Sequence, residues 1–237
     1  MGHTFYIMTT SMNSNVYDML VGMDRIAYPR TPHLPESLGA GKYDSHAKKP
    51  TLDNLASGIE LIVTEKMDGG NVTLYNDFFH ARSVDATSLP WETMAKNVWS
   101  VKRFLIPDGW RVSCESMFAQ RSVPYDILPA PLFVIGVWDE DNNFLSWDDV
   151  NSFAEELELP VVPFLYRGND FVEAKKAWGK VLNDEISEGF VVRNAGSFSY
   201  DTFGLNASKW VRKNHVRTPD DFRRRDDFKR NTFERIY

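Results

Sequence analysis

The stretch "EKMDGGN" (residues 65–71) places a lysine and an aspartate beside a Gly-Gly corner. The residues on either side of it, 59–65 and 71–76, alternate between apolar and polar, which is typical of strands. Glycines 69 and 70 adopt positive φ at little cost, so the stretch predicts a tight turn between two strands. A turn of this kind needs no charge at Lys66, so the lysine indicates a site and not only a corner.

The rest of the chain predicts short strands with helices between them. Residues 1–58, with their prolines and glycines, are predicted to be extended chain and loop. Strands are expected at 78–83, 110–118, 131–139, 161–168, 188–194 and 208–214. Helices are expected at 88–105, 146–159, 170–182 and 218–231, the second with Ser146 and Asp149 in capping-box positions. Helices and strands do not alternate strictly, so the pattern indicates an α+β fold with antiparallel sheets flanked by helices.

Composition narrows the class of protein. The 237 residues are 43% hydrophobic, which suits one large domain with or without a small appendage. No apolar run reaches about 18 residues, so no membrane-spanning helix is expected. The N-terminus lacks a basic segment followed by an apolar one, so no signal peptide is expected. Cys114 is the only cysteine, which excludes an internal disulfide and a cysteine zinc site and favours a reducing, cytoplasmic setting.

Charge is distributed unevenly along the chain. The net charge is −6, yet residues 209–237 hold ten Lys/Arg and five Asp/Glu. This basic end fits either a surface for a polyanion or a solvated terminal helix. The glycines of "GAGK" (39–42) do not make a phosphate-binding P-loop, because position 36 is Glu and position 43 is Tyr.

Charged residues also occur on or beside strands that are otherwise apolar. They are Lys66 and Asp68, Glu115, Glu188 and Lys209. An unpaired buried ion costs several kcal/mol, so each needs a partner, which an ordinary salt bridge could supply. Together they offer two cations and three carboxylates, enough for the phosphates of a nucleotide and a metal ion.

Three of these segments resemble the signature of the covalent nucleotidyltransferases, which include ATP-dependent ligases and mRNA capping enzymes. "EKMDGGN" is similar to their K-x-D-G motif, "SEGFVVRN" (187–194) to their E-G-x-V-x-K strand, and "KWVRK" (209–213) to their last lysine strand. With "VSCESMFAQRSVPYD" and "VPFLYRG", the chain from about residue 27 to 220 resembles small RNA ligases of phages and bacteria.

The resemblance implies a nucleotidyltransferase (ATP-grasp-like ligase) fold over residues 1–215, followed by a short basic helical tail, 216–237. DNA ligases and capping enzymes carry an OB-type barrel after the lysine strand. Only 24 residues follow Lys213, so no such barrel is expected here.

The resemblance also assigns roles to residues. Lys66 would be the nucleophile that attacks the α-phosphate of ATP, with Lys209 as the second catalytic lysine. Asp68, Glu115 and Glu188 would hold Mg²⁺ (or Mn²⁺), largely through its waters. The residues implied to bind the nucleotide are Glu65, Asp68, Gly69, Asn71, Arg82, Glu115, Ile135, Glu188, Val191, Arg193 and Lys209.

A lysine nucleophile must lose its proton, and the ordinary pKa of lysine is about 10.4. Burial, the nearby Lys209 and a bound cation are all expected to lower the pKa of Lys66. The family places an aromatic residue against adenine where this chain has Ile135, so an aliphatic face, Phe133 or Trp138 would take that role. Arg193 stands where the family has lysine, and arginine is not equivalent to lysine at a phosphate.

These residues predict an ATP-dependent RNA ligase that joins RNA 5′-phosphate and 3′-OH ends through a lysyl-AMP. RNA ends are the expected partners, and no membrane is expected. A DNA ligase or capping-type enzyme, and an inactive nucleotide- or RNA-binding module, are the alternatives. The basic tail is expected to contact the RNA backbone, so that its deletion would leave adenylylation of Lys66 intact.

Overall fold

The strands form two antiparallel sheets. The computed structural model describes residues 25–85, 90–182, 186–213 and 228–234. The four-stranded sheet has the order β10-β8-β1-β7, and the six-stranded sheet has the order β3-β2-β4-β5-β6-β9. The first is made of β1 (Leu61–Lys66), β7 (Phe164–Gly168), β8 (Gly189–Asn194) and β10 (Ala207–Val211). The second is made of β2 (Gly70–Leu74), β3 (Phe79–Ala81), β4 (Arg111–Ser116), β5 (Leu132–Trp138), β6 (Asn143–Phe144) and β9 (Phe198–Ser199).

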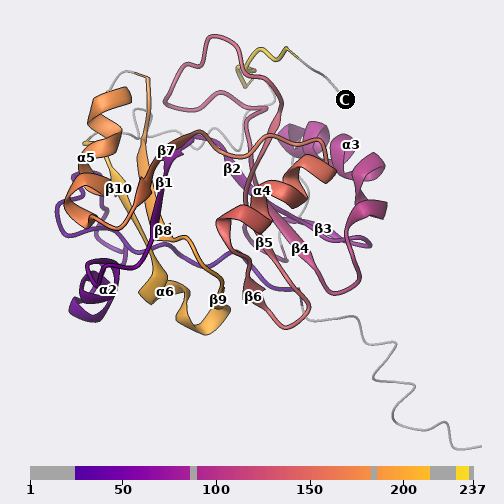
Figure 1. Ribbon diagram of the computed structural model, residues 1–237. Coiled ribbons are helices and arrows are strands. Elements are labelled where there is room, and N and C mark those ends of the chain that lie inside the picture. The colour runs from indigo at the N-terminus through magenta and orange to yellow at the C-terminus, as the bar shows by residue number, and fades with distance from the viewer. Residues whose placement is uncertain (1–24, 86–89, 183–185, 214–227, 235–237) are drawn as a thin grey trace, which may run out of the picture.

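Helices cover the outer faces of the two sheets (Figure 1). They are α2 (Lys49–Leu55), α3 (Thr93–Lys102), α4 (Trp147–Glu156), α5 (Phe171–Val181) and α6 (Phe203–Asn206), with 3-10 turns at Pro90–Glu92, Arg103–Leu105 and Tyr200–Thr202. The expected cap of α4 is confirmed, since the Ser146 side chain accepts a hydrogen bond from the Asp149 N–H at 3.2 Å. None of the helices in the described ranges is long and apolar enough to cross a membrane.

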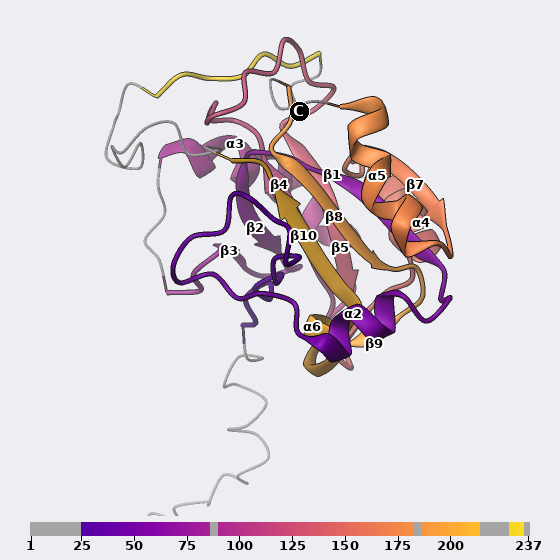
Figure 2. The same cartoon turned by 90° about the vertical axis from the view of Figure 1, so that its left-hand side faces the viewer.

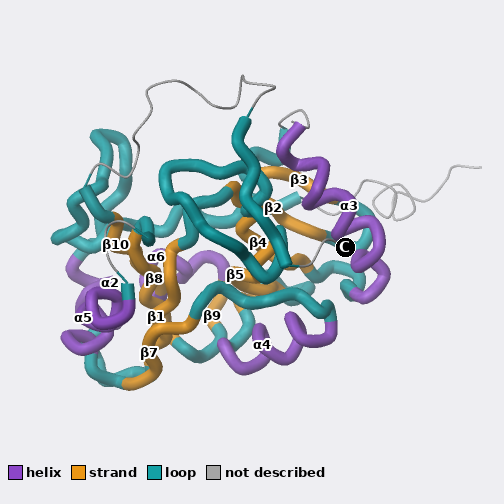
Figure 3. Tube along the Cα trace, turned by 90° about the horizontal axis from the view of Figure 1, so that it is seen from above, coloured by secondary structure: helices purple, strands orange, loops and turns teal. Residues whose placement is uncertain are grey.

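Each sheet has its own core. One cluster joins the six-stranded sheet to α3 and α4, with Val98, Val134 and Val150 fully buried. A smaller cluster lies between the four-stranded sheet and α5, around Val63 and Ala174. Figure 3 shows, from above, β1 and β8 on one side and β4 and β5 on the other, so the two sheets present their inner faces to each other. The α+β prediction is confirmed.

Two expected elements differ in the structure. The tight turn at 69–70 does not make a hairpin, because β1 and β2 belong to different sheets. The predicted helix at 218–231 falls mostly outside the described residues, and the part that is described, from Phe228 onward, is extended. That part pairs with the loop between β4 and β5 through the bridges Ala119↔Arg230 and Leu128↔Phe233. The wider division into a domain and a basic tail stays a prediction.

Candidate active site

The corner after β1 crosses from one sheet to the other. A Cβ placed on Gly69 would lie 2.5 Å from the carbonyl oxygen of Ser116 and 2.6 Å from the sulfur of Met117. Gly69 is therefore required by the close approach of β4. The expected reason, a positive φ, is wrong, because the described glycines with positive φ are Gly58, Gly109 and Gly189. The K-x-D-G stretch is thus the link that carries Lys66 from one sheet and Asp68 toward the other.

Strand register brings the two lysines to one face. Lys66 pairs with Gly189 of β8, and Lys209 of β10 pairs with Val191 two residues further along. Side chains alternate along a strand, so Lys66, Val191 and Lys209 all point into the space between the sheets. We call this space the groove. Glu65 lies on the opposite face of β1, where burial raises its pKa to about 7, so the structure does not bring it beside Lys66.

Lys66 forms a close ion pair at the mouth of the groove. Its Nζ donates to Oε2 of Glu188 at 2.6 Å. Burial alone lowers the pKa of Lys66, but the negative charges of Glu188 and Glu115 outweigh burial and raise the pKa above its ordinary value. The expectation that the pKa of Lys66 is lowered is therefore wrong for the protein without ligand. Without ligand, the amine of Lys66 is therefore protonated, and it can lose its proton more easily only if positive charge is added near it.

Lys209 behaves in the opposite way. Burial, followed by the charge of Lys66, lowers the pKa of Lys209 to about 8. The segment 32–34 holds β10 at its free edge. The Lys209 N–H donates to Pro32 O at 2.9 Å, and the Leu34 N–H donates to Lys209 O at 2.7 Å. Figure 2 shows the segment before α2 running beside β10.

Asp68 is held by the loop between β4 and β5. Its Oδ2 accepts hydrogen bonds from the N–H groups of Ser122 at 2.7 Å and Val123 at 2.9 Å. Its own N–H donates to the hydroxyl of Tyr125 at 3.0 Å. Burial and then the charge of Glu188 raise the pKa of Asp68, although the Val123 bond acts against this rise.

Glu115 faces the groove from the six-stranded sheet. Burial raises its pKa to about 7, while Lys66 and then Arg121 lower it, and Glu188 and Asp68 raise it again. The negative charges of Asp68, Glu115 and Glu188 therefore repel one another, and a cation among them would reduce this repulsion. Among the described residues no three His, Cys, Asp or Glu side chains lie close enough to ligate one metal directly. A metal held through its waters, as predicted, fits this spacing better than direct ligation.

Unsatisfied polar groups line the six-stranded side of the groove. Asn71 lies opposite Glu115, and Thr73 lies opposite Ser113, across the β2–β4 pair. Both amide atoms of Asn71 and the hydroxyl oxygens of Thr73 and Ser113 are buried without a hydrogen-bond partner in the described structure. Such groups cost about 1–3 kcal/mol each when left unpaired, so this wall fits a polar ligand such as a nucleotide.

Arg193 joins β8 to β5 inside the protein. Its Nη1 donates to the carbonyl oxygen of Ile135 at 2.6 Å. Its guanidinium carbon lies 4.4 Å from the ring centre of Trp147 and 5.1 Å from that of Phe144. The side chain is 5% exposed, and its Nε and Nη2 are buried without a hydrogen-bond partner in the described structure, so its expected contact with the nucleotide stays a prediction.

The remaining predicted residues lie around the groove. Ile135 is the extra residue at a bulge in β5, and Val191 of β8 is half-buried between Thr64 and Lys209. Trp138 is fully buried in an aromatic cluster, which removes it as a partner for a base. Phe133 lies opposite Glu115 and is 3% exposed. Arg82 is exposed just after β3. Burial and the charge of Lys66 are the larger causes of the lowered pKa of Lys209, and the charge of Arg82 lowers it further. Arg82 therefore lies near Lys209.

Sequence patterns missed two loop residues and one residue of the N-terminal segment. Arg121 comes within 3.0 Å of where a Cβ on Gly70 would stand, and its charge acts on Asp68 and Glu115. Tyr125 bonds Asp68, as described above. Tyr28 is packed edge-on against Phe203 and feels the charges of Arg193 and Glu115. All three lie outside regular strands, where no periodicity predicts the direction of a side chain. For Arg121 and Tyr125 the only signal was the resemblance of the segment 112–126, and for Tyr28 it was the wider resemblance that begins at about residue 27.

Comparisons with known proteins identify a family and a fold. The sequence profile of the family described as "RNA ligase" matches residues 59–211. The structure is similar to the Naegleria gruberi RNA ligase with PPi, with a TM-score of 0.51, 17% identity, and coverage of 80% of this chain and 61% of that one. It is also similar to an archaeal ATP-dependent RNA ligase, with a TM-score of 0.51, 15% identity, and coverage of 78% and 48%.

A putative ATP-dependent DNA ligase from Aquifex aeolicus matches as well, with a TM-score of 0.52, 20% identity, and coverage of 80% of this chain and 50% of that one. The chain thus spans about half to three-fifths of the length of these three solved structures. At these identities the likeness shows the fold, in which no additional barrel is found beside the two sheets of the described chain. No curated protein matches the sequence.

Proposed function

Because this chain belongs to the RNA ligase family, we propose that it is an ATP-dependent RNA ligase that works through a lysyl-AMP on Lys66. The observation that carries the proposal is the Lys66 amine, 2.6 Å from Glu188, on the same groove-facing side of the sheet as Lys209. Of the similar structures, the archaeal protein is described as an ATP-dependent RNA ligase, which supports ATP as the nucleotide.

The first step is attack on ATP. Lys66 Nζ forms a bond to the α-phosphorus, the bond from that phosphorus to the bridging oxygen breaks, and pyrophosphate leaves. Lys66 must first give up a proton, and Glu188 is the group within hydrogen-bond distance to receive it. Lys209 stabilises the negative charge that grows on the α-phosphate.

A divalent ion fits the three carboxylates. Asp68, Glu115 and Glu188 would hold Mg²⁺ or Mn²⁺ through its waters, and the ion would supply positive charge for the triphosphate and for lowering the pKa of Lys66. Arg121 places a further positive charge beside Asp68 and Glu115. The groove then contains the positive charge that favours a neutral Lys66 amine.

Two further steps complete joining. The 5′-phosphate of one RNA end attacks the lysyl-AMP, which breaks the bond between nitrogen and phosphorus and leaves an adenylylated RNA. The 3′-OH of the second end then attacks the RNA 5′-phosphate, and AMP leaves. Lys209 lies beside the phosphate of AMP, which is attacked in the second step and departs as the leaving group in the third, so its charge can act in both. A cation held by the carboxylates would supply further positive charge.

The adenosine lies deeper in the groove in this proposal. Val191 and Ile135 would pack against the base from the two sheets, and the unpaired amide of Asn71 would bond to its polar groups. Glu115 would bond the ribose or a water of the metal. Arg82, at the mouth, would contact the sugar side or the RNA 3′-OH. The cytoplasmic setting predicted from the single cysteine is retained.

The test uses ATP and Mg²⁺ without RNA. Intact-mass measurement should show a gain of one AMP, and peptide mapping should place it on Lys66. Lys66→Ala should remove the adduct, while Lys49→Ala, a change at an exposed lysine of α2, should leave it unchanged. An adduct that survives in Lys66→Ala, or its absence from the wild-type protein, would contradict the proposal.

The DNA ligase alternative has one observation in its favour, the similar Aquifex aeolicus fold. A DNA ligase would form the same adduct on Lys66, so the two alternatives are distinguished by which nucleic acid, RNA or DNA, the protein joins. Nicked or single-stranded RNA and DNA of one sequence should be offered in parallel. Sealing of DNA at a rate equal to or above that of RNA would move the assignment to the DNA enzyme.

A further inference from the structure

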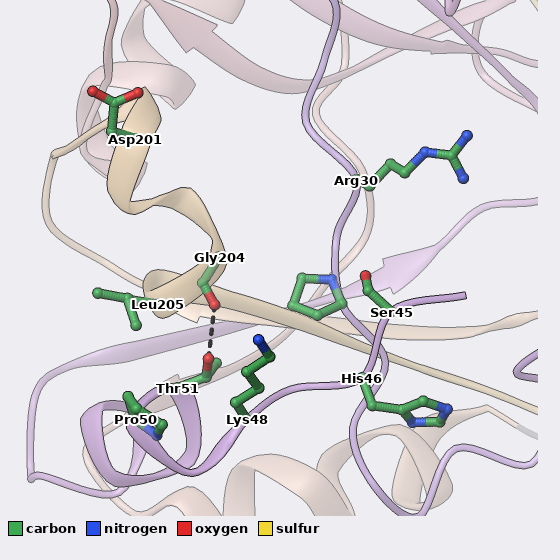
Figure 4. A pocket seen from close by; sticks show the side chains of 10 residues that line it. Arg30, Ser45, His46, Lys48, Pro50, Thr51, Asp201, Gly204 and Leu205 are labelled. Carbon is green, nitrogen blue, oxygen red and sulfur yellow. Dashed lines mark hydrogen bonds between the residues drawn. The ribbon is translucent and has the colours of Figure 1, made fainter. Parts of the chain in front are cut away.

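A separate cavity lies beyond the edge of the four-stranded sheet, outside the groove. It has a volume of about 310 Å³ and lies between the segment before α2, the start of α2 and the turn before β10 (Figure 4). Its charged lining residues are Arg30, His46, Lys48 and Asp201. None of these residues takes part in the proposed adenylylation of Lys66.

The walls of the cavity are fixed in place. Thr51 Oγ1 donates to the carbonyl oxygen of Gly204 at 2.8 Å, which joins α2 to α6 across the cavity. One turn later, Asn54 Nδ2 donates to Leu205 O at 3.0 Å. A site whose walls are tied in this way needs little rearrangement to accept a ligand, so less binding free energy is lost to ordering.

Among the described residues, neither cation of the cavity forms an ion pair. Arg30 and Lys48 are both exposed, and Arg30 lies close enough to Asp44 for its charge to act on that carboxylate. By contrast, the neighbouring Lys49 pairs with Asp53 at 2.6 Å. The one carboxylate of the lining, Asp201, points away from the Lys48 amine in Figure 4. Two exposed cations that form no ion pair within the described residues line this cavity, in a chain of net charge −6, and they indicate a site for an anion.

The position of the cavity favours a phosphate of a polymer. Pro32, which lines it, accepts the backbone bond of Lys209, so the cavity adjoins the catalytic strand. Val211 marks the position of Lys66 along β10, because both residues pair with Gly189. Ala207, at the cavity end of β10, is four residues from Val211. Four residues span about 13 Å along a strand, so the cavity end of β10 is about that far from Lys66. A triphosphate ends two phosphates beyond its α-phosphate, whereas an RNA strand continues over this distance.

We propose that the cavity between α2 and α6 binds a backbone phosphate of the RNA strand whose end reacts in the groove. Arg30 and Lys48 supply the positive charge, and the hydroxyl of Ser45 is available as a donor. The contact is to phosphate and carries no preference for base sequence. This proposal rests on the RNA ligase function proposed above, and it adds the path that the strand follows away from Lys66.

The test measures binding of a short 5′-phosphorylated single-stranded RNA at several salt concentrations. The double variant Arg30→Ala/Lys48→Ala should bind RNA at least about fivefold more weakly. Its plot of log K against log salt should be shallower by about 1.4, because each lost single-strand phosphate contact removes about 0.7 from the slope. Both residues are exposed, so the variant should fold normally and keep its thermal midpoint.

Two matched variants sharpen the comparison. Lys49→Ala removes the same charge one residue away and should leave the slope unchanged. Asp201→Asn removes the lining carboxylate and should strengthen RNA binding. Equal slopes for Lys49→Ala and the double variant would overturn the proposal. So would a rise in the KM for ATP with RNA binding unchanged, which would assign the cations to the triphosphate.

The result is separable from the proposed function. Formation of the Lys66 adduct from ATP alone should be the same in the double variant and in the wild-type protein. An unchanged RNA slope with normal adduct formation would reject the cavity and leave the ligase. Absence of the adduct from the wild-type protein would reject the ligase itself.

Discussion

The ion pair between Lys66 and Glu188 has two opposing effects on the chemistry. The carboxylate holds the lysine in place, but its charge, with that of Glu115, raises the pKa of the amine that has to react. Burial lowers the pKa of Lys66, but the two carboxylates together raise it by more. In the function proposed above, a divalent cation that accompanies ATP would act against these carboxylates and favour the neutral amine of Lys66.

Glu188→Gln tests this balance. Removing the largest charge that raises the pKa of Lys66 should lower that pKa, so labelling of the amine by an acylating reagent should reach half its maximal rate at a lower pH than in the wild-type protein. Adenylylation with ATP and Mg²⁺ should nevertheless fall at least about tenfold, a loss of about 1.4 kcal/mol in transition-state stabilisation. Labelling is read by mass spectrometry of the peptide that contains Lys66.

The control is Glu173→Gln, which removes an exposed carboxylate paired with Lys176 and Lys180 on α5. It should change neither the labelling profile nor adenylylation. If Glu188→Gln lowers the pKa of Lys66 and adenylylation is retained or accelerated, Glu188 is only a salt-bridge partner.

Among the elements, the extended segment 228–234 has the clearest effect on the site. Its Asn231 donates from Nδ2 to Met117 O at 2.7 Å, and Glu234 N–H donates to Leu128 O at 2.8 Å. The same loop provides the N–H groups that hold Asp68. The segment therefore supports the active site, and the prediction that deleting the tail leaves adenylylation intact does not follow from this packing.

Asn231→Ala should loosen the loop. The loss of one buried hydrogen bond is worth about 1 kcal/mol, so we expect adenylylation to fall roughly fivefold while the thermal midpoint moves by a few degrees. Thr232→Ala, a change at the next, exposed residue, serves as the control. Equal adenylylation rates in both variants would show that the segment does not position Asp68.

Local elements were predictable from sequence to the extent that local rules decide them. The cap of α4 at Ser146 and the strands around Glu188 and Lys209 follow from residue pattern and are present. The hairpin at 69–70 was wrong because β1 pairs with β7 and β8, about a hundred residues or more away, and no pattern within residues 59–76 encodes that choice.

At the scale of the whole molecule, Arg193 connects the two sheets. It extends from β8 to the carbonyl of Ile135 on β5 and lies against the rings of Trp147 and Phe144. Burial lowers the pKa of Arg193 to about 10, so it keeps its proton near neutral pH. Arg193 pairs with Ile62, four residues before Lys66 on β1, so this contact joins the two sheets at a distance from the reactive lysine.

Arg193→Lys should lower the free energy of unfolding by about 2 kcal/mol. Lysine has no planar guanidinium, so it cannot stack on the rings of Trp147 and Phe144 and at the same time donate a hydrogen bond to the Ile135 carbonyl. Urea denaturation provides this measurement. Arg167→Lys, at an exposed arginine paired with Asp148 and Glu60, should leave it nearly unchanged, because surface ion pairs contribute little. A normal stability with a large rise in the KM for ATP would return Arg193 to the phosphate role first expected of it.

The pairing of Lys66 with Glu188 joins residues 122 positions apart, and β1 is an inner strand flanked by β7 and β8. Contacts of such long sequence separation are slow to form, because the entropy of closing the intervening chain is lost before the contact stabilises anything. The fold should therefore refold slowly for its size. The order of events is testable in refolding after dilution from denaturant: adduct-forming capacity should appear with the slowest phase, after most helical signal has returned.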